Sequence, residues 1–309
     1  IFVEAQRHPA TDYPESLFPE SASALLDIER REQFEDSGVL FESSYFLTFV
    51  WLPPAEEAGW DGCFIGDAIW CEDPMIALAA AATATSRIRL GTMITPAPLR
   101  HPWKIASESV ALDRLSDGRL ILGLGAGAVW MGWHAFPDVV TDSKSRAVML
   151  DETIDILTLL YQRQPFDYDG QQFHLKLTGL DVMHYPPPPV QQPRIPLWVP
   201  GLWPRPKSMA RVLKGDGLLV EKVGEDGRPS AATPDDVRQM KAFVAANRHF
   251  TTPFDIIMNG SVKDLAPAAQ QETLLAWQDA GVTWWIEGLW GDPDEVVNEV
   301  IRRGPPQLG

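Results

Sequence analysis

The sequence predicts an α/β fold, an eight-stranded (β/α) TIM barrel with an abnormal first βα unit and an insertion before the fifth strand. Short apolar runs alternate with helical patterns in seven successive units after residue 60. Each apolar run is nearly continuous, as in strands that are buried on both faces of a parallel sheet. The roughly 250 residues from position 55 onward match the usual size of such a barrel. A doubly wound open sheet is the alternative.

The predicted strands and helices follow one another in alternation along the chain. The strands are expected at residues 63–67, 88–96, 119–125, 196–201, 216–222, 254–260 and 283–290. The helices are expected at residues 73–86, 102–116, 145–162, 206–214, 234–248, 267–281 and 292–303. One further strand at the start would complete the eight that a closed barrel needs.

The first part of the chain does not follow this alternation. The apolar run YFLTFVWL at 45–52 reads as a strand, but only PPAEEAG separates it from the next one. A parallel crossover needs a dozen or more residues, so a normal first βα unit is absent. We therefore treat 1–40 as an N-terminal extension with a charged helix at 23–38, and 41–309 as the barrel. In that barrel 45–52 would serve as a substitute first strand.

A long excursion at 165–196 separates the helix at 145–162 from the next strand. It contains a hairpin candidate around Asp169 and Gly170, followed by YPPPPVQQPRIP. Four consecutive prolines form a stiff polyproline segment. Two interpretations stay open and carry equal weight: a rigid linker back to the barrel, or a wall over the mouth of the active site.

Composition and charge narrow the classes of partner. The formal net charge is −16, so nucleic acid and an anionic membrane surface are not expected as partners. No apolar run reaches the roughly 18 residues of a membrane span, and the N-terminus lacks the pattern of a signal peptide. The cysteines Cys63 and Cys71 read as ordinary thiols of a reducing compartment. A cytoplasmic protein is expected, although the chain begins without Met and fits a fragment as well.

The stretch GRLILGLGAGAVW at 118–130 matches the dinucleotide fingerprint G-x-G-x-x-A directly after a predicted strand. That fingerprint also requires a helix that opens at the glycines and a second strand that ends in an acidic residue about 20 positions later. The sequence shows neither. In a barrel the same glycines lie at the carboxyl end of a strand, where ligands bind. Glycine there lets a flat ligand approach the backbone closely, or merely eases a tight turn.

The other carboxyl ends of strands supply the remaining candidate site residues. These are Asp67, Thr95, Pro200, Gly201, Glu221, Lys222, Asn259, Gly260 and Glu287. Acids and a hydroxyl with so few histidines do not indicate a metal centre, and no G-x-S-x-G elbow is present. The set is typical of a site in which a cofactor supplies the chemistry. For a phosphate, the nearest cations are Arg205, Lys207 and Arg211, although isolated basic residues are more often solvated surface.

Several blocks resemble the luciferase-like flavin-dependent oxidoreductases. They are AEEAGWDGCFIGD, SRIRLGTMITPAPLRHP, ALDRLSDGRLILGLGAG, LDETIDILTLLYQRQPFDYDGQQFHL and GVTWWIE, in that order over 55–309. The resemblance implies a barrel that binds flavin mononucleotide (FMN) or a deazaflavin (coenzyme F420). It implies monooxygenation or hydride transfer on a small-molecule substrate, with a flavin reductase or NAD(P)H as electron source. It also implies a homodimer, and it places the insertion near the substrate.

The resemblance also implies roles for individual residues. Thr95 and the loop Gly125, Ala126 and Gly127 would flank the cofactor ring. Gly201, Arg205 and Lys207 would meet its phosphate. The second strand of the family commonly ends in Asp-His, and that His assists proton transfer or oxygen chemistry. Here the pair is Asp67 and Ala68.

Loss of a general acid–base group costs about 10²–10⁴-fold in rate. Water, His101 or His134 could substitute for the missing His, although a lone His is more often structural. A non-catalytic flavin-binding remnant is therefore the main alternative function. A cofactor-free barrel hydrolase or aldolase is a further one.

The N-terminal part resembles a different family. AQRHPATDYPESLFPES and DIERREQFEDSGVLFESSYFLTFVWLPPAE are similar to the N-terminal region of the conjugative-transfer ATPases of type IV secretion. The two resemblances meet near Pro54 and Ala55, so the chain reads as a junction of two unrelated coding segments. The first strand and most of the first helix of the barrel would then be missing. No Walker motif is present, so ATPase activity is not implied.

Overall fold

The computed structural model describes residues 52–69, 73–289 and 294–306. All of them belong to the second of two compact units, Ser43–Gly309. The predicted extension at 1–40 lies outside the described residues. The predicted boundary at residue 40 therefore stays a prediction.

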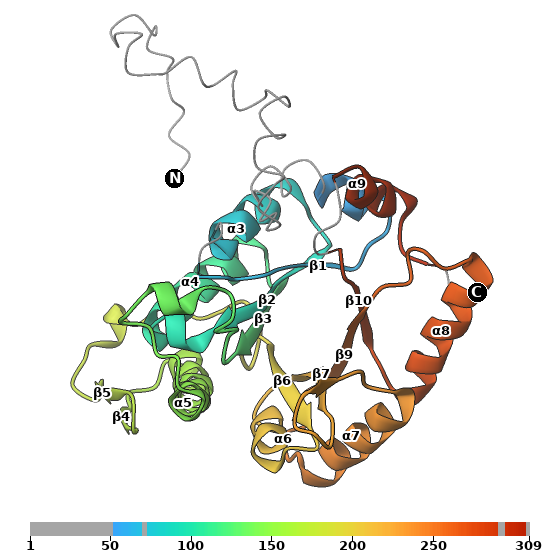
Figure 1. Cartoon of the computed structure of the whole chain (residues 1–309). Coiled ribbons are helices and arrows are strands. Elements are labelled where there is room, and N and C mark those ends of the chain that lie inside the picture. The colour runs from blue at the N-terminus through green and yellow to red at the C-terminus, as the bar shows by residue number, and fades with distance from the viewer. Residues whose placement is uncertain (1–51, 70–72, 290–293, 307–309) are drawn as a thin grey trace, which may run out of the picture. The chain divides into compact units, whose positions relative to one another are not determined.

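Seven parallel strands form one curled sheet, with helices on its outer face (Figure 1). The strands are β1 (Gly62–Ile65), β2 (Arg89–Pro96), β3 (Leu120–Gly125), β6 (Leu197–Trp203), β7 (Gly217–Val223), β9 (Asp255–Gly260) and β10 (Trp284–Glu287). They pair in the order of the sequence, and the short β8 (Pro229–Ser230) pairs antiparallel with β7. This order is that of a (β/α) barrel, because each strand is followed by a helix that returns the chain to the next strand.

The sheet is a half-barrel in the described part of the chain, because β1 and β10 form its two edges and do not pair with each other. The prediction of a closed eight-stranded barrel is therefore correct for the α/β class and for seven strands, and the described residues contain no eighth strand of the ring. The predicted first strand at 45–52 falls outside the described residues except for Leu52, which lies in helical residues 52–57.

The helices that cover the sheet have the predicted order. They are α3 (Pro74–Ala84), α4 (Pro102–Leu115), α5 (Ser143–Gln162), α6 (Pro206–Val212), α7 (Pro234–Asn247), α8 (Pro267–Ala280) and α9 (Asp294–Arg303). Five of them have Pro in the first turn, where its missing N–H costs nothing. Asp73 accepts hydrogen bonds from Met75 N and Ile76 N and so caps α3, as an N-cap side chain does.

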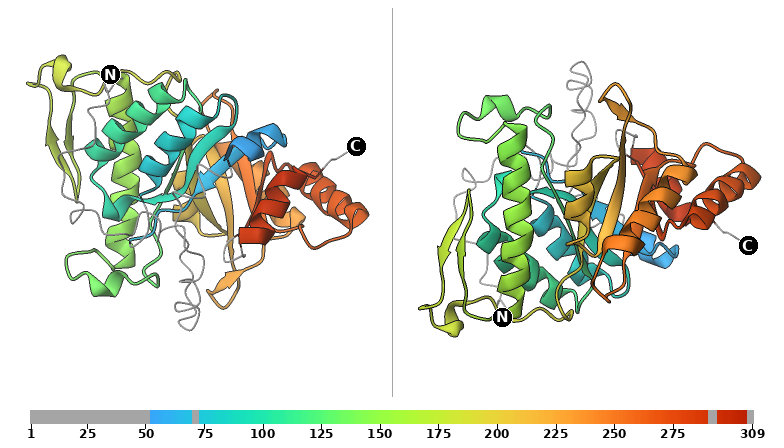
Figure 2. Two further views of the ribbon diagram at one scale, coloured as in Figure 1. Left: turned by 90° about the horizontal axis from the view of Figure 1, so that it is seen from above. Right: turned by 90° about the horizontal axis from the view of Figure 1, so that it is seen from below.

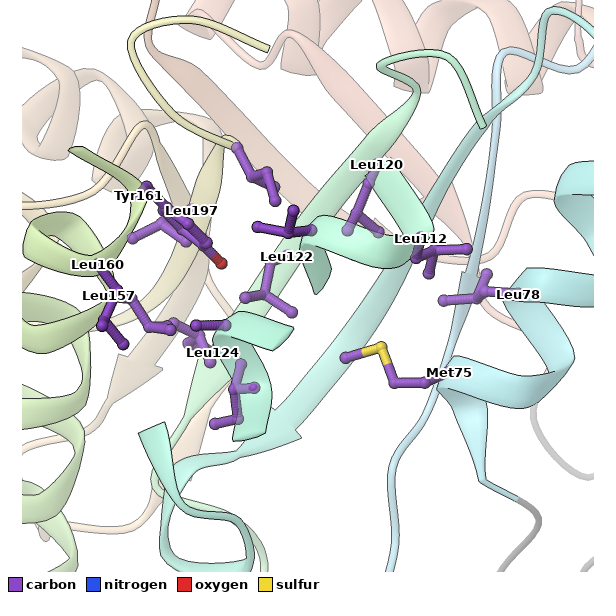
Figure 3. Close-up of a cluster of buried hydrophobic side chains, with 14 of the residues drawn as sticks. Met75, Leu78, Leu112, Leu120, Leu122, Leu124, Leu157, Leu160, Tyr161 and Leu197 are labelled. Atoms are coloured by element: carbon purple, nitrogen blue, oxygen red, sulfur yellow. The ribbon is translucent and has the colours of Figure 1, made fainter. Parts of the chain in front are cut away.

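The main core lies between the sheet and the helices α3, α4 and α5 (Figure 3). Leu120, Leu122 and Leu124 of β3 are fully buried and point toward these helices. Each such side chain stabilises the fold by about 1.5–3 kcal/mol relative to an exposed one. The odd-numbered positions of β3 therefore face the other way, toward the inside of the curl.

Three aromatic rings from non-adjacent strands fill the inside of the curl. Phe64 of β1 stacks on Trp198 of β6 at a ring-centroid distance of 4.8 Å, and Trp284 of β10 lies 5.5 Å from Trp198. Ile121 and Ile257 belong to the same cluster. These contacts join the two edges of the half-barrel through its interior, and they identify the inward-facing positions on every strand that takes part.

The helix at 52–57 packs on the barrel as the end of a first helix would. Leu52 and Ala55 are buried in the main core, and Trp60 Nε1 donates to the carbonyl of Ile301 at 2.9 Å. The carboxylate of Glu56 accepts backbone N–H groups of the α3–β2 turn. The described residues 52–60 thus pack with the barrel on both sides of the predicted junction at 54–55.

The excursion between α5 and β6 contains the predicted hairpin, formed by β4 (Asp167–Asp169) and β5 (His174–Lys176). It lies beside α5, on the side away from the sheet (Figure 2). Three backbone N–H groups of its turn, those of Gln171, Gln172 and Phe173, donate to Glu152 of α5.

The polyproline segment leads to the amino end of the sheet. After it, Val190 N donates to Asp113 of α4 at 2.7 Å. The Gln191 amide donates to Asp113 and to the carbonyl of Leu120, the first residue of β3. The part of the excursion that these contacts hold therefore lies opposite the carboxyl ends of the strands. This placement supports the interpretation as a rigid linker over that of a wall at the mouth.

None of the helices in the described ranges is both long enough and apolar enough to cross a membrane.

Candidate functional site

The carboxyl ends of the parallel strands gather at one end of the curled sheet, where barrels of this architecture hold their ligands. Two half-buried side chains of β2, Met93 and Ile94, pack against the inner cluster there. The β2–β3 pairing shifts register between Thr92 and Thr95, which marks an irregularity in β2. Beyond this irregularity Thr95 and Pro96 pair again with Leu124 and Gly125 of β3.

Asp67, the predicted catalytic acid after β1, is held in an ion-pair network. Arg100 donates from Nε to Asp67 Oδ2 at 3.0 Å and from Nη2 to Asp73 Oδ2 at 2.7 Å. Glu108 lies 3.5 Å from the same guanidinium. Burial by itself lowers the pKa of Arg100, but Asp67 and Asp73 raise it by more than burial lowers it. The pKa is therefore raised, and the guanidinium stays charged. Asp67 thus fixes the loops after β1 and β2 to the start of α3.

Ala68 follows Asp67 and is half-buried. It carries no group that can transfer a proton. The position at which the family resemblance expects a His is therefore chemically inert in this chain.

Thr95 is fully buried at the end of β2. Its Oγ1 hydroxyl donates to Thr92 Oγ1 at 3.0 Å, and Thr92 in turn donates to the carbonyl of Gly123. This chain of hydrogen bonds ties β2 to β3 at the irregularity. The Thr95 proton is therefore already used, while its oxygen can still accept.

The glycine loop after β3 is shaped by neighbouring side chains of the chain itself. A Cβ at Gly125 would lie 1.8 Å from Ile94 Cδ1, and one at Gly127 would lie 2.3 Å from the Trp133 ring. Arg146 of α5 donates to the carbonyls of Ala126 and Gly127 at 2.7 and 2.9 Å. The lack of side chains at Gly125 and Gly127 therefore makes room for Ile94 and Trp133. A ligand at this loop would contact Ile94 and the loop backbone, because the space beside the glycines is already filled.

The predicted phosphate residues separate into one buried and two exposed positions. Gly201 faces the helices, because a Cβ there would lie 2.2 Å from Leu218 Cδ1 and 2.9 Å from Val212 Cγ2. Arg205 and Lys207 are exposed at the start of α6, and neither forms an ion pair with any described residue. Arg211, by contrast, is bound by Asp151 at 2.7 Å. Arg205 and Lys207 are thus the cations of this set that are left for an anion.

The other reactive side chains considered from the sequence form no hydrogen bond or ion pair with Asp67, Thr95 or the glycine loop among the described residues. His101 stacks on Trp103 at 4.5 Å, and His134 is exposed in the short helix η5 (Trp133–Ala135). Burial raises the pKa of the Cys63 thiol to about 12, so it stays protonated, and Cys71 lies outside the described residues. Within the described ranges, no three His, Cys, Asp or Glu side chains gather as metal ligands would.

Among the remaining strand-end residues, Lys222 and Glu287 point outward, and Glu221 and Asn259 point inward. Lys222 pairs with Asp236 at 2.8 Å, and Glu287 accepts the N–H of Val262 at 2.9 Å, so both stabilise loops or helices outside the curl. Glu221 lies two residues after Leu219 of the inner cluster, and Asn259 lies two residues after Ile257. Because residues two apart in a strand share a face, both side chains point inward. Both are exposed at the inner carboxyl end. The inward orientation of Glu221 and Asn259 follows only from the inner aromatic cluster. A continuous apolar run does not reveal which of its positions face the inside of the curl and which face the helices.

Two family models match the chain. The luciferase-like monooxygenase family matches residues 52–263, and the N-terminal domain of the type IV secretion system ATPase VirB4/TrbE matches residues 1–59. The first match begins at residue 52 and runs through β9. It contains the predicted site residues except Glu287 of β10.

Individual proteins of known name agree with the first match. A coenzyme F420-dependent oxidoreductase of Mycobacterium tuberculosis is 36% identical over 130 residues, which are 40% of this chain and 35% of that protein. The chain thus spans about a third of the length of this curated relative.

Two solved structures share the fold. The coenzyme F420 dependent tetrahydromethanopterin reductase from Methanopyrus kandleri aligns with a TM-score of 0.64 at 17% identity, over 85% of this chain and 95% of that one. The oxygenating constituent of 3,6-diketocamphane monooxygenase from Pseudomonas putida, in complex with FMN, aligns with a TM-score of 0.66 at 16% identity, over 86% and 92%. At these identities the likeness concerns the fold.

Proposed function

Because the chain belongs to the luciferase-like monooxygenase family, we propose that it is an oxidoreductase that binds FMN or a deazaflavin at the carboxyl ends of β2 and β3. Its reaction would be monooxygenation or hydride transfer on a small organic molecule. The observation that carries this proposal is the end of β2. There Met93 and Ile94 offer an apolar surface beside the glycine loop.

The residues present fit a flat ring with a phosphate tail. The apolar surface suits the ring. Arg146 already binds two carbonyls of the loop at 125–127, so the N–H groups of that loop are the backbone groups that would bind the polar edge of the ring. Arg205 and Lys207 would hold the phosphate as charge-assisted donors. When bound, the flavin or deazaflavin would supply the hydride or oxygen chemistry, while the protein orients the substrate and excludes water.

Titration of the full chain with FMN and with coenzyme F420, followed by quenching of their fluorescence, tests the proposal. We expect saturable binding of one of the two. The absence of saturable binding of either would overturn the proposal. Anaerobic reduction of the bound cofactor by NAD(P)H or by a flavin reductase then tests the activity.

Comparison of FMN with riboflavin, which lacks the phosphate, tests the role of the two cations. We expect the double variant Arg205→Ala, Lys207→Ala to lose about tenfold in FMN affinity, the equivalent of about 1.4 kcal/mol, and to bind riboflavin as before. The exposed Arg238 of α7, which pairs within its own helix, provides the control Arg238→Ala. Equal loss for both ligands would contradict a phosphate site at these residues.

One observation supports a second candidate function, a flavin-binding barrel with impaired catalysis. Ala68 stands where the family resemblance expects a His, and a general acid–base group is worth about 10²–10⁴-fold in rate. We expect Ala68→His to raise turnover tenfold or more if the missing group limits the reaction. Cofactor binding without any turnover in the unmodified chain would favour this second function.

A further inference from the structure

A row of inward-facing side chains crosses the carboxyl ends of four neighbouring strands and takes no part in the proposed cofactor contacts. The register pairs Leu202 of β6 with Glu221 of β7, and Asn259 of β9 with Ile286 of β10. Glu221 and Asn259 lie two residues beyond the paired Leu219 and Ile257 of adjacent strands. The row therefore reads Leu202, Glu221, Asn259, Ile286, with its two polar members in the middle.

The layer below this row is apolar. Leu219 and Ile257 are buried there, and Trp284 lies beside Ile257 in the same layer. Below them Trp198 stacks on Phe64. A ligand at this end would thus rest on hydrocarbon and meet two polar groups side by side.

Glu221 and Asn259 have no hydrogen-bond or ion-pair partner among the described residues, and both are exposed. The cation next in sequence, Lys222, points outward to Asp236 and so does not neutralise Glu221. Leu202 and Asn259, its neighbours in the row, are uncharged. Enclosure by the surrounding protein raises the pKa of Glu221, although its side chain keeps solvent contact.

We propose that Glu221 and Asn259 form the substrate-recognition pair of this barrel, and that they select a small, otherwise apolar molecule that carries a hydroxyl or amine group. An ionised carboxylate only accepts hydrogen bonds, so it favours a donor and repels an anion. The NH2 group of the Asn259 amide can donate a hydrogen bond to the same hydroxyl oxygen, or its carbonyl oxygen can accept a second hydrogen bond from an amine. The inference rests on the proposed function, in which the cofactor occupies the β2–β3 side and leaves β7 and β9 to the substrate.

Two probes that differ only in methylation of one oxygen test this hydrogen bond. 4-Fluorophenol carries an O–H donor, and 4-fluoroanisole carries a methyl ether in its place. Their dissociation constants for the full chain are measured by ¹⁹F NMR titration, with and without FMN. We expect the phenol to bind about tenfold tighter than the ether, as a charge-assisted hydrogen bond allows.

Substitutions at Glu221 then locate the preference. We expect Glu221→Leu to reduce the ratio of the two constants to about one, and Glu221→Gln, which still accepts a hydrogen bond, to keep part of it. Glu225 is exposed in the turn after β7, so Glu225→Gln is the matched control and should leave the ratio unchanged. A preference that survives Glu221→Leu, a ratio of one in the unmodified chain, or no binding of either probe would overturn the proposal.

The two proposals fail in distinguishable ways. The FMN titration of the unmodified chain reports on the cofactor site alone. A phenol preference that depends on Glu221, in a chain that binds neither FMN nor coenzyme F420, would support the recognition pair and contradict the cofactor proposal. FMN binding without a phenol preference would support the cofactor proposal and contradict the recognition pair.

Discussion

At the scale of single residues, the carboxylates of this chain differ in the work that they do. Glu56 and Asp67 bind groups of the protein itself, whereas Glu221 binds none of the described residues. An acid at the end of a strand is therefore not by itself a catalytic candidate. Its partners decide whether it is available to a ligand.

Glu56 offers a test of this distinction through the pH dependence of stability. Burial by itself raises the pKa of Glu56, but hydrogen bonds from the N–H groups of Ile88, Arg87 and Ser86 lower it by more. The pKa is therefore lowered from 4.5 to about 2. A lowered pKa stabilises the fold above about pH 4.5, and this stabilisation is lost as the pH falls toward 2.

We expect Glu56→Gln to lower the free energy of unfolding by about 1–2 kcal/mol at pH 7 in urea titrations. The difference should shrink as the pH falls from 4.5 to 2. The exposed neighbour Glu57, changed to Gln, is the control and should show no such trend. A Glu56→Gln effect that is constant with pH would contradict the proposed binding of the carboxylate.

At the scale of elements, the approach of β2 to β3 explains the glycine run. A Cβ at Gly123 would lie 2.2 Å from the backbone carbonyl of Thr92, which cannot move without displacing β2. The atom that a Cβ at Gly125 would meet is instead the end of the flexible Ile94 side chain. The first glycine is thus required by the fold, and the second by the position of one side chain.

We expect Gly123→Ala to destabilise the protein by about 3 kcal/mol, since overpacking of a buried strand typically costs about 1–3 kcal/mol or more. Gly132 has a φ of +90° and no atom within 4 Å of the added Cβ, so Gly132→Ala should cost only about 1 kcal/mol of backbone strain. Thermal unfolding of both variants measures the difference. Equal costs would show that β2 and β3 do not approach as described.

The seven βα units after residue 60 could be predicted because each strand is a short apolar run bounded by turn residues, and each helix is long enough to recognise. The choice between the linker and the wall interpretation of the polyproline segment could not be made from the sequence, because the contacts of Gln191 with Asp113 join positions 78 residues apart. The same holds for Arg100 and Asp67, which meet over 33 residues of sequence. Side-chain networks between loops leave no periodic signal.

At the scale of the whole molecule, the inner aromatic cluster joins the two edges of the half-barrel. Trp198 is fully buried at its centre, and its Nε1 has no hydrogen-bond partner in the described structure. Trp198 therefore stabilises the fold through the packing of its ring, and the burial of its unpaired indole N–H reduces that stabilisation.

We expect Trp198→Ala to destabilise the protein by about 3–5 kcal/mol through the cavity that it leaves. Trp198→Phe should cost much less, because it keeps an aromatic ring and removes the unpaired N–H, whose burial costs about 1–3 kcal/mol. Urea unfolding followed by circular dichroism measures both. Trp130 is 83% exposed, and Trp130→Ala should change stability by less than about 0.5 kcal/mol. A small effect of Trp198→Ala would contradict a bridging role of the cluster.

The closure of the barrel and the inner face of the site were the parts that the sequence alone could not predict. The apolar run at 45–52 has the composition of a strand, but Leu52, its one described residue, is helical, and a closed ring requires pairing partners on both edges. Glu221 and Asn259 were visible as strand-end residues. Their shared inward orientation needed the position of Trp198, Trp284 and Phe64, which strands without alternation do not reveal.

The central claim is that a flavin or deazaflavin binds at the carboxyl ends of β2 and β3. Hydrogen–deuterium exchange of the full chain, with and without saturating FMN or coenzyme F420, tests it most directly. We predict slower exchange in peptides that cover residues 93–96 and 125–127, with little change at the amino ends of the same strands. Unchanged exchange with both cofactors, or protection confined to other parts of the chain, would contradict the claim.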